Sequence, residues 1–333
     1  MKIFYAVQAT GNGHISRAME LYPYLREYGT VDFFLSGGNS TLSLDVPVKY
    51  RSKGMSLYYN CNGGLDYWQI MKGIKPLRIR REIRELPVNE YDLVINDFDY
   101  ITAAACANGG VPSVQFGHQA SFISANTPRP SARNRTGEWI LKNYAKASRY
   151  IGLHFESYDD FIFTPVVRRD ILEAQPEDLG YITVYLPSYC EPQLIRLFEQ
   201  FSDHRFEIFC GQISEEKKVN NMRLLPVSRE AFSTSMIGCH GLITGGGFET
   251  PAEALHLGKK ILSVPIRSQY EQQCNAAALE KMGVHCLQQI DNNFQATVYN
   301  WLQNAPIIKK DYSQSIPQAL AHLFATAPVP VQA

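Results

Sequence analysis

The sequence of 333 residues lacks an excess of charge of either sign. Its 32 lysines and arginines balance 32 aspartates and glutamates, so the formal net charge is +0. Proteins whose main partner is nucleic acid usually carry a basic excess or a concentrated basic face. The charge balance therefore argues against nucleic acid as a main partner.

Paired cysteines and long apolar runs are also missing. The seven cysteines stand singly, with no Cys-x-x-Cys pair and an odd total. This pattern is typical of a reducing compartment and not of a disulfide framework or a zinc site. No apolar run approaches the roughly 18 residues of a membrane-spanning helix, and the apolar start at residues 3–7 is too short for a signal peptide. We therefore expect a cytoplasmic protein without a membrane span.

One segment leaves a membrane contact open. Across residues 67–86, apolar side chains interleave with lysines and arginines. Such a segment can lie on an anionic membrane surface, which would place the protein at the inner face of the membrane. We favour the alternative of a solvated helix that packs on a sheet, because Pro76 interrupts any single amphipathic face.

Short β-rich runs alternate with helical patterns along the chain, which predicts parallel sheets with helices on both faces. The clearest strands of a first series are expected at 2–9, 31–35, 93–96 and 113–116, and those of a second series at 181–186, 206–210, 241–244 and 261–264. The length also favours two domains. We expect a first domain at 1–165, a linker at 166–180, a second domain at 181–305 and a final helix with its tail at 306–333.

A glycine-rich turn follows the expected strand at 241–244. Gly245, Gly246 and Gly247 turn the chain, and we expect the next helix to begin with Thr250 as its N-cap. Free N–H groups and the positive end of a helix bind anions, so a diphosphate fits this turn. Glu253 either completes a capping box with Thr250 or contacts a ligand.

A segment rich in carboxamides follows the next expected strand. After Pro265 the chain runs to Ala276 through Glu271, Gln272 and Asn275. Ligands of open α/β sheets bind beyond the carboxyl ends of the strands. Several directional donors and acceptors at this place suit sugar hydroxyls.

Together these residues resemble the GT-B glycosyltransferases, which include the UDP-glycosyltransferases and the N-acetylglucosaminyltransferase of peptidoglycan synthesis. The matching positions are Gly245, Gly246, Gly247, Glu253, Gly258, Pro265, Glu271, Gln272, Asn275 and Ala276. Within the family, the chain is most similar to bacterial and archaeal UDP-glucuronosyltransferase-like proteins, through residues 247–248 and 269–272.

The resemblance implies two Rossmann-like domains that face each other across a cleft, with the C-terminal helix crossing back to the first. It implies that a nucleotide-sugar, with UDP as the expected nucleotide, is the substrate and that no further cofactor is needed. Glu253 would hold the ribose hydroxyls, and the turn with Phe248 would hold the phosphates. Glu271 and Gln272 would hold hydroxyls of the donor sugar, and Asn275 would belong to the same nucleotide-sugar site.

Two departures from the family pattern concern the phosphates. Gly245 stands where relatives commonly place a His or Arg, and the loop at 186–189 lacks the glycine-rich phosphate turn of the peptidoglycan enzyme. Ser188 with backbone N–H groups, and Arg267 as a cation, are the expected replacements.

A second candidate site follows the first expected strand. The run at 10–18 contains Gly11, Gly13 and His14, but Ser16 takes the place of the third glycine of a dinucleotide fingerprint. A lone His at a strand end is often structural. In the family that the chain resembles, the same Gly-His pair lies in the cleft opposite the nucleotide, which makes His14 the expected general base and Gly13 an acceptor contact.

A base of this kind needs a carboxylate that raises its basicity and holds its tautomer. Asp97, at the end of another expected strand, is our first choice and Asp99 is the alternative. Asp97 has an equally plausible structural role as a helix cap. His118 and Gln119 follow a third strand, as acceptor contacts or, for His118, as the rival base.

We therefore expect an inverting glycosyltransferase with a hydroxyl acceptor, a lipid-linked acceptor being among the candidates. No Asp-x-Asp pair follows a strand of the nucleotide domain, so we expect no obligatory metal, with the helix dipole stabilising the leaving group. Two alternatives stay open, a nucleotide-sugar 2-epimerase on the same fold and a catalytically silent nucleotide-sugar-binding protein.

Overall fold

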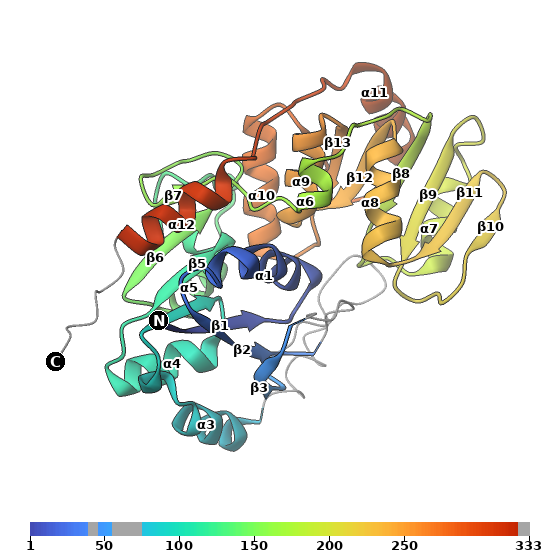
Figure 1. Ribbon diagram of the computed structural model, residues 1–333. Helices are drawn as coiled ribbons and strands as arrows, with labels where there is room; N and C mark the ends of the chain where they lie inside the picture. Colours follow the sequence, from blue (N-terminus) through green and yellow to red (C-terminus); the bar gives the residue numbers. More distant parts are fainter. Residues whose placement is uncertain (39–45, 55–74, 326–333) are drawn as a thin grey trace.

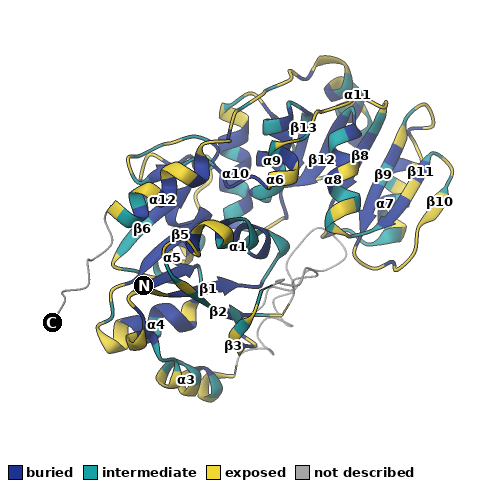
Figure 2. Cartoon of the chain, in the orientation of Figure 1, coloured by how far each residue is buried: buried dark blue, intermediate teal, exposed yellow. Residues whose placement is uncertain are grey.

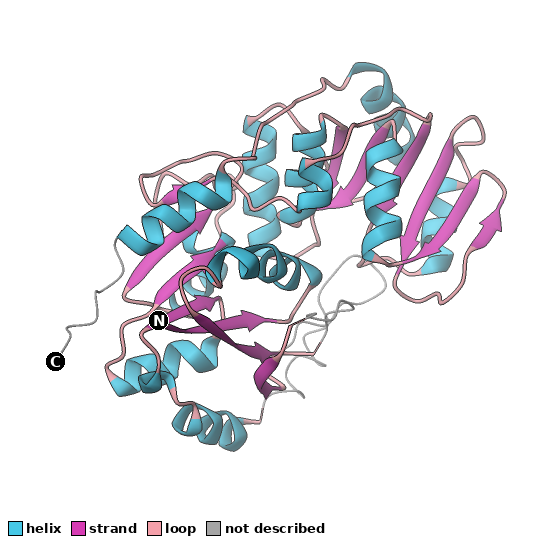
Figure 3. Ribbon diagram, viewed as in Figure 1, coloured by secondary structure: helices cyan, strands magenta, loops and turns pink. Residues whose placement is uncertain are grey.

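The computed structural model describes residues 1–38, 46–54 and 75–325. It contains two seven-stranded sheets, and Figure 3 shows that helices flank the strands of each sheet. Among the residues described, every strand pair but one is parallel. The expected α/β fold with two doubly wound lobes is confirmed.

The first lobe is built on the sheet with strand order β3-β2-β1-β4-β5-β6-β7 (Figure 1). Its strands are β1 (Lys2–Gln8), β2 (Thr30–Ser36), β3 (Val48–Ser52), β4 (Leu93–Asp97), β5 (Val114–Gly117), β6 (Arg149–Leu153) and β7 (Ile162–Phe163). The order reverses between β1 and β4, where Val7 pairs with Asp97. Such a reversal is the place where open α/β sheets bind ligands.

The second lobe repeats the plan with strand order β10-β11-β9-β8-β12-β13-β14. Its strands are β8 (Tyr181–Tyr185), β9 (Arg205–Cys210), β10 (Lys217–Val219), β11 (Met222–Pro226), β12 (Gly241–Gly245), β13 (Lys260–Val264) and β14 (His285–Cys286). Only β10 and β11 run antiparallel among the described strand pairs. Here the order reverses between β8 and β12.

Eleven α-helices accompany these strands in the described ranges. They are α1 (Asn12–Leu25), α3 (Pro76–Glu85), α4 (Tyr100–Gly109), α5 (Arg135–Asn143), α6 (Arg169–Leu172), α7 (Glu191–Phe198), α8 (Arg229–Gly238), α9 (Glu249–Leu257), α10 (Tyr270–Lys281), α11 (Phe294–Asn304) and α12 (Ser315–Ala325). Short 3₁₀-helices lie at Val88–Glu90 and His118–Ile123.

The eight strands expected from the sequence are all present, with ends within about two residues. The strands that the sequence did not indicate are β3, β6, β7, β10, β11 and β14. Most of these lie toward the edges of the two sheets, and β7 and β14 have only two residues each. Short edge strands carry too little of the alternating or continuous apolar pattern to be distinguished from loops.

Figure 2 shows dark, buried strands beneath helices whose outer faces are exposed. On one face of the second sheet, α7 and α11 share a core that contains Phe198 and Trp301. On the other face, α8, α9 and α10 belong to a core that continues into the first lobe through Phe155 and Phe248. The two lobes therefore meet through packed apolar side chains as well as through polar groups.

The helix α12 packs against the first lobe. Ile316, Ala319 and Leu320 join the core that contains β1 and β6, and Ser315 Oγ lies 2.5 Å from Thr164 Oγ1. Figure 1 shows α12 beside β6 and β7. The tail beyond residue 325 lies outside the described residues.

The basic amphipathic segment is described only from residue 75 onward. Its helix α3 buries Ile79 in a core with Phe4 and Val94, as the favoured packing alternative requires. Leu77 is 82 % exposed, and Arg80 is exposed beside it. The structure contains no helix long and apolar enough to cross a membrane among the residues it describes.

Candidate active site between the lobes

The candidate base His14 and its carboxylate meet at the reversal point of the first sheet. His14 lies in the first turn of α1, directly after β1, and Asp97 ends β4. His14 Nδ1 lies 2.9 Å from Asp97 Oδ1. Asp97 is fully buried, whereas 13 % of the His14 side chain is exposed. The sequence-based pairing of these two residues therefore corresponds to a direct contact.

Asp97 is also held by Arg17, which the sequence reasoning did not include in the site. Arg17 Nε lies 3.1 Å from Asp97 Oδ2 and Nη2 lies 2.8 Å from Oδ1, a two-pronged ion pair in the interior. Burial raises the pKa of Asp97, but the charges of Arg17 and His14 outweigh that effect and leave it below its usual value. Asp97 is therefore an anion at neutral pH.

Asp97 in turn sets the basicity of His14. Burial lowers the pKa of the imidazole, but the charge and hydrogen bond of Asp97 outweigh it, so the pKa of His14 lies above its ordinary value. Arg17 Nη2 also lies 2.9 Å from Nδ1. Nη2 of Arg17 already donates to Asp97. When Nδ1 of His14 carries the proton and also donates to Asp97, the N–H groups of both residues have an acceptor. Nε2 then remains the basic nitrogen, and it has no hydrogen-bond partner among the described residues.

Asp99, the alternative carboxylate, is the helix cap. It precedes α4, and its Oδ2 accepts a hydrogen bond of 2.6 Å from the N–H of Thr102. The structural role considered for Asp97 therefore belongs to Asp99. Gly117, at the end of β5, lets the backbone approach the carboxylate, because a Cβ there would lie 2.5 Å from Asp97 Oδ1.

His118 and Gln119 contact the second lobe directly. His118 Nδ1 lies 2.9 Å from the Leu153 carbonyl oxygen and Nε2 lies 2.7 Å from Asn275 Oδ1. Its ring stacks on Phe248 with centroids 3.9 Å apart, and burial lowers its pKa. Gln119 Nε2 donates to Glu271 Oε2 at 3.1 Å. With both nitrogens occupied, His118 is poorly placed to be the rival base.

The glycine-rich turn lies where the second sheet reverses. It links β12 to α9, but α9 begins at Glu249 with Phe248 as N-cap, so the expected cap Thr250 is wrong. Thr250 lies inside the first turn because the chain adopts helical geometry directly after the glycines. A Cβ on Gly247 would meet no atom within 4 Å, so open space lies beside the turn.

Glu253 is engaged by the segment that joins the lobes. Arg168 Nε lies 2.5 Å from Glu253 Oε1 and Nη2 lies 2.8 Å from Oε2, and both side chains are buried. The capping-box alternative for Glu253 is therefore wrong, since its oxygens bind Arg168 and not the Thr250 N–H. The ribose role stays a prediction.

Gln272 and Asn275 brace the turn from the neighbouring helix. Gln272 Oε1 accepts from the N–H groups of Gly246 at 3.1 Å and Ile266 at 2.8 Å. Asn275 Nδ2 donates to the Gly246 carbonyl oxygen at 3.0 Å. Both side chains are buried, whereas Glu271 keeps 23 % of its side chain exposed. Of these three polar residues, Glu271 is the one best placed to reach a ligand.

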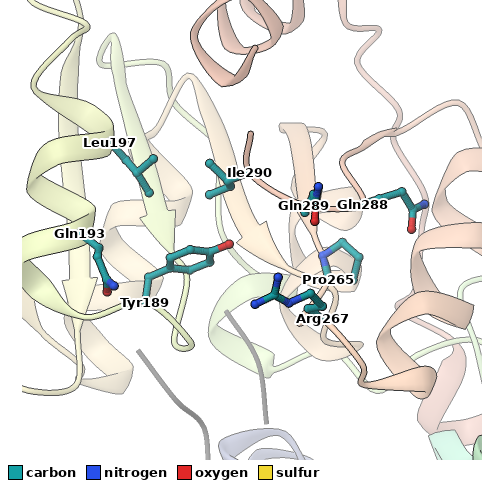
Figure 4. Close-up of a pocket in the computed structure, with 8 residues that line it drawn as sticks. All are labelled: Tyr189, Gln193, Leu197, Pro265, Arg267, Gln288, Gln289 and Ile290. Carbon is teal, nitrogen blue, oxygen red and sulfur yellow. The ribbon is translucent and has the colours of Figure 1, made fainter. Parts of the chain in front are cut away.

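A pocket of about 290 Å³ opens at the carboxyl edge of the second sheet. Figure 4 shows Tyr189 and Arg267 on opposite loops of this pocket, with Gln193 and Gln288 among the lining side chains. The loop that carries Tyr189 also carries Ser188, which is buried. Arg267, the expected replacement cation, therefore lies beside a space that can hold a ligand.

Arg17, Arg168 and Glu249 are the residues that sequence reasoning missed at this site. Arg17 stands three residues after His14 on the same helix face, a spacing that places two side chains side by side. Helical spacing could therefore have found it. The partners of Arg168 and Glu249 are far away in the sequence, at Glu253 and Arg17, and no local pattern indicates such pairs.

Metal ligands are not assembled in the described ranges, where no group of three or more His, Cys, Asp or Glu side chains has a suitable arrangement. The cysteines at 106, 210, 239, 274 and 286 are free thiols.

Two doubly wound lobes whose reversal points face each other define the GT-B glycosyltransferases. A family model described as glycosyl transferase family 1 matches residues 1–306. The chain therefore belongs to glycosyl transferase family 1 and is a glycosyltransferase. No curated protein matches the sequence.

Solved structures show the same fold at low sequence identity. UGT89C1 of Arabidopsis thaliana in complex with quercetin is 12 % identical, with a TM-score of 0.62 over 98 % of this chain and 99 % of that chain. Acinetobacter baumannii MurG is 17 % identical, with a TM-score of 0.54 over 98 % and 99 %. SnogD from Streptomyces nogalater is 15 % identical, with a TM-score of 0.50 over 97 % and 99 %. UGT89C1 has also been solved with UDP and with UDP-L-rhamnose.

Proposed function

We propose that this glycosyltransferase is inverting and metal-independent and moves a sugar from a UDP-sugar to an acceptor hydroxyl. The observation that carries the proposal is the His14–Asp97 pair, with a buried anion on one imidazole nitrogen and no described partner on the other. This pair lies at the lobe junction, within reach of α9 through Arg17 and Glu249. A base at this position faces the lobe that carries the glycine-rich turn.

The chemistry follows from this placement. The acceptor oxygen attacks the anomeric carbon while His14 Nε2 takes the acceptor proton, and the bond between that carbon and the diphosphate oxygen breaks. The electron pair of that bond leaves with the nucleoside diphosphate. Attack from the side opposite the leaving group inverts the anomeric configuration. Asp97 stabilises the imidazolium that forms and holds the Nδ1–H tautomer.

We assign donor binding to the second lobe. Gly245, Gly246, Gly247 and Phe248 with the start of α9 would offer backbone N–H groups to the diphosphate, joined by Ser188 and Arg267. Glu253 would hold the ribose, and Glu271 the donor sugar, while Gln272 and Asn275 hold the turn in shape. The UDP complexes of UGT89C1, which shares the fold, support UDP as the nucleotide.

We assign acceptor binding to the first lobe. Gly13 lies directly before the base, and His118 and Gln119 would line the acceptor side of the junction. The described part of the amphipathic segment, α3, exposes Arg80, Arg81 and Arg84. A lipid-linked acceptor, reached by peripheral membrane contact of this helix, therefore belongs in the acceptor panel.

The test begins with the donor. UDP-, GDP- and TDP-sugars are screened by thermal shift, since a ligand bound to the folded state raises the melting temperature. The stabilising donor is then incubated with and without an acceptor panel, and nucleotide release and the anomeric configuration of the product are measured. Inversion with one acceptor class supports the proposal. An isomerised donor without acceptor indicates the epimerase, and binding without any turnover indicates the silent binding protein.

A further inference from the structure

Arg17 connects the candidate base to the opposite lobe. It lies on α1, is 2 % exposed, and its Nε and Nη2 bind Asp97. The remaining arm of the guanidinium, Nη1, binds the carboxylate of Glu249. Glu249 is the first residue of α9 in the second lobe. A continuous chain of charged groups therefore runs from His14 through Asp97 and Arg17 to Glu249.

The approach of Glu249 to the first lobe is close. A Cβ on Gly13 would collide with the Glu249 carboxylate, so a larger residue before the base would push this carboxylate aside. The Glu249 side chain keeps 23 % exposure, whereas Arg17 and Asp97 are buried. Of these four charged residues, Glu249 is the one that comes from the other lobe and from the solvent side.

The charged groups that face His14 come from three elements. Asp97 of β4 favours the protonated imidazole, Arg17 of α1 disfavours it, and Glu249 of α9 favours it. Tyr5 of β1 faces Arg17 and Asp97, and burial raises its pKa well above the usual value, so it is neutral. When Glu249 is absent, the positive charge of Arg17 acts on His14 with only Asp97 to offset it.

We propose that Arg17 and Glu249 are positioning residues that complete the charge environment of His14 only when the two lobes are in contact. The proposal rests on the proposed role of His14 as the base. Contact of the lobes joins the ion pair, offsets the charge of Arg17 and makes His14 a better proton acceptor. Separation of the lobes removes Glu249 and leaves a weaker base. His14 therefore removes the acceptor proton best when α9 and the glycine-rich turn of the second lobe lie against the first lobe.

The test is the titration of His14 followed by NMR in the unliganded protein, with the resonance assigned by comparison with His14→Gln. Glu249→Gln removes the charge but leaves Arg17 bound to Asp97, so the fold should persist. The midpoint of the His14 titration should move to lower pH. Glu249→Asp, whose carboxylate is withdrawn by one methylene, should give a midpoint between those of Glu249→Gln and the wild type.

The chain offers a matched control in a second ion pair between the lobes. Arg229 Nη2 of α8 lies 2.6 Å from Glu20 Oε1 on the same helix α1. Glu20→Gln removes this ion pair but leaves the pair of Arg17 and Glu249 in place, so Glu249 stays near His14 and the titration midpoint should not change. A wild-type midpoint in Glu249→Gln, or an equal shift in Glu20→Gln, would overturn the proposal.

Two further variants, Glu249→Asp and His14→Ala, make the test conclusive. If Glu249→Gln does not fold, Glu249→Asp carries the test, and a wild-type midpoint in that variant overturns the proposal. The NMR readout needs no transfer reaction, so it separates this proposal from the proposed function. A His14→Ala protein with full transfer rate would refute the base role even if the titration shifts as expected.

Discussion

Glu253 binds Arg168 through both carboxylate oxygens, at 2.5 Å and 2.8 Å, in the interior of the protein. Arg168 belongs to the segment that joins the lobes, and its third nitrogen donates to Ser233 Oγ at 2.7 Å. Burial lowers the pKa of Arg168, but the charge of Glu253 outweighs it, so the guanidinium stays charged. The carboxylate proposed to hold the ribose therefore also ties the joining segment to the second lobe, and a nucleotide bound there must share it or displace Arg168.

We predict that Glu253→Gln weakens UDP binding, because the ribose hydroxyls lose a charged acceptor worth about 1.5–3 kcal/mol. Calorimetry with UDP measures the loss, at a temperature where circular dichroism shows the variant to be folded. Ser233→Ala is the control, since it loosens Arg168 and leaves Glu253 intact, and its UDP affinity should stay near the wild type. Unchanged binding in folded Glu253→Gln would leave Glu253 with the structural role alone.

The glycine-rich turn allows a paired prediction. A Cβ on Gly246 would lie 2.9 Å from both Gln272 and Pro265, whereas a Cβ on Gly247 would meet no atom within 4 Å. Gly246→Ala should therefore destabilise the fold by about 1–3 kcal/mol through overpacking. Gly247→Ala should fold as the wild type but bind UDP more weakly, because its methyl group enters the proposed phosphate space. Chemical denaturation and calorimetry check the two effects.

Equal stability of both alanine variants would contradict the steric argument for Gly246. Full UDP affinity of Gly247→Ala would move the phosphates away from this turn and toward the pocket beside Arg267.

How much of the structure can be predicted from the sequence depends on how far apart in the sequence the interacting residues lie. The strands that carry the site, β1, β4, β8, β12 and β13, are long and apolar and were predicted. The contact of His14 with Asp97 could be expected because His14 follows β1 and Asp97 ends β4, and the carboxyl ends of parallel strands share one edge of the sheet. The cap was expected at Thr250, two residues after the actual cap Phe248, because Phe248 adopts helical geometry directly after the glycines.

The contacts between the lobes could not be predicted in the same way. Arg168 and Glu253 are 85 residues apart, and Arg17 and Glu249 are 232 apart. Neither pair shares a periodic pattern, because each pairing depends on how distant parts of the chain pack together. The buried role of Gln272 was missed because its partners are backbone N–H groups of two loops, one of which, at Gly246, is 26 residues away.

Gln272 provides a stability prediction. Its Oε1 accepts from two buried N–H groups, on Gly246 and Ile266. Gln272→Met fills a similar volume but leaves both donors without an acceptor, which should cost about 1–3 kcal/mol for each unsatisfied group. Gln272→Glu keeps the acceptor and should cost less. Urea denaturation orders the three proteins, and an equally stable methionine variant would show that the carboxamide does not brace the turn.

His14→Ala should lower the transfer rate by about 10²–10⁴-fold, the usual loss when a general base is removed. UDP affinity should change little, because the donor groups lie on the other lobe. Steady-state kinetics with saturating donor, together with calorimetry, separates the two effects. A full transfer rate in His14→Ala would return the base role to His118, the runner-up, despite its two occupied nitrogens.

Asp97→Asn tests the sign of the electrostatic effect on that base. In the wild type the transfer rate should rise with pH as His14 loses its proton, and because Asp97 keeps the pKa of His14 above its ordinary value, this rise should lie above the pH at which free imidazole titrates. Replacing Asp97 removes the anion, while burial and Arg17 still oppose protonation, so the rising limb should move to lower pH. The limiting rate should fall less than in His14→Ala, because a weaker base remains. Since Arg17 loses its main buried partner, the variant should also lose about 3–5 kcal/mol of stability, and rates must be measured below its melting temperature. A limb that stays in place, or moves to higher pH, would show that the group titrating in the rate profile is not the imidazole beside Asp97.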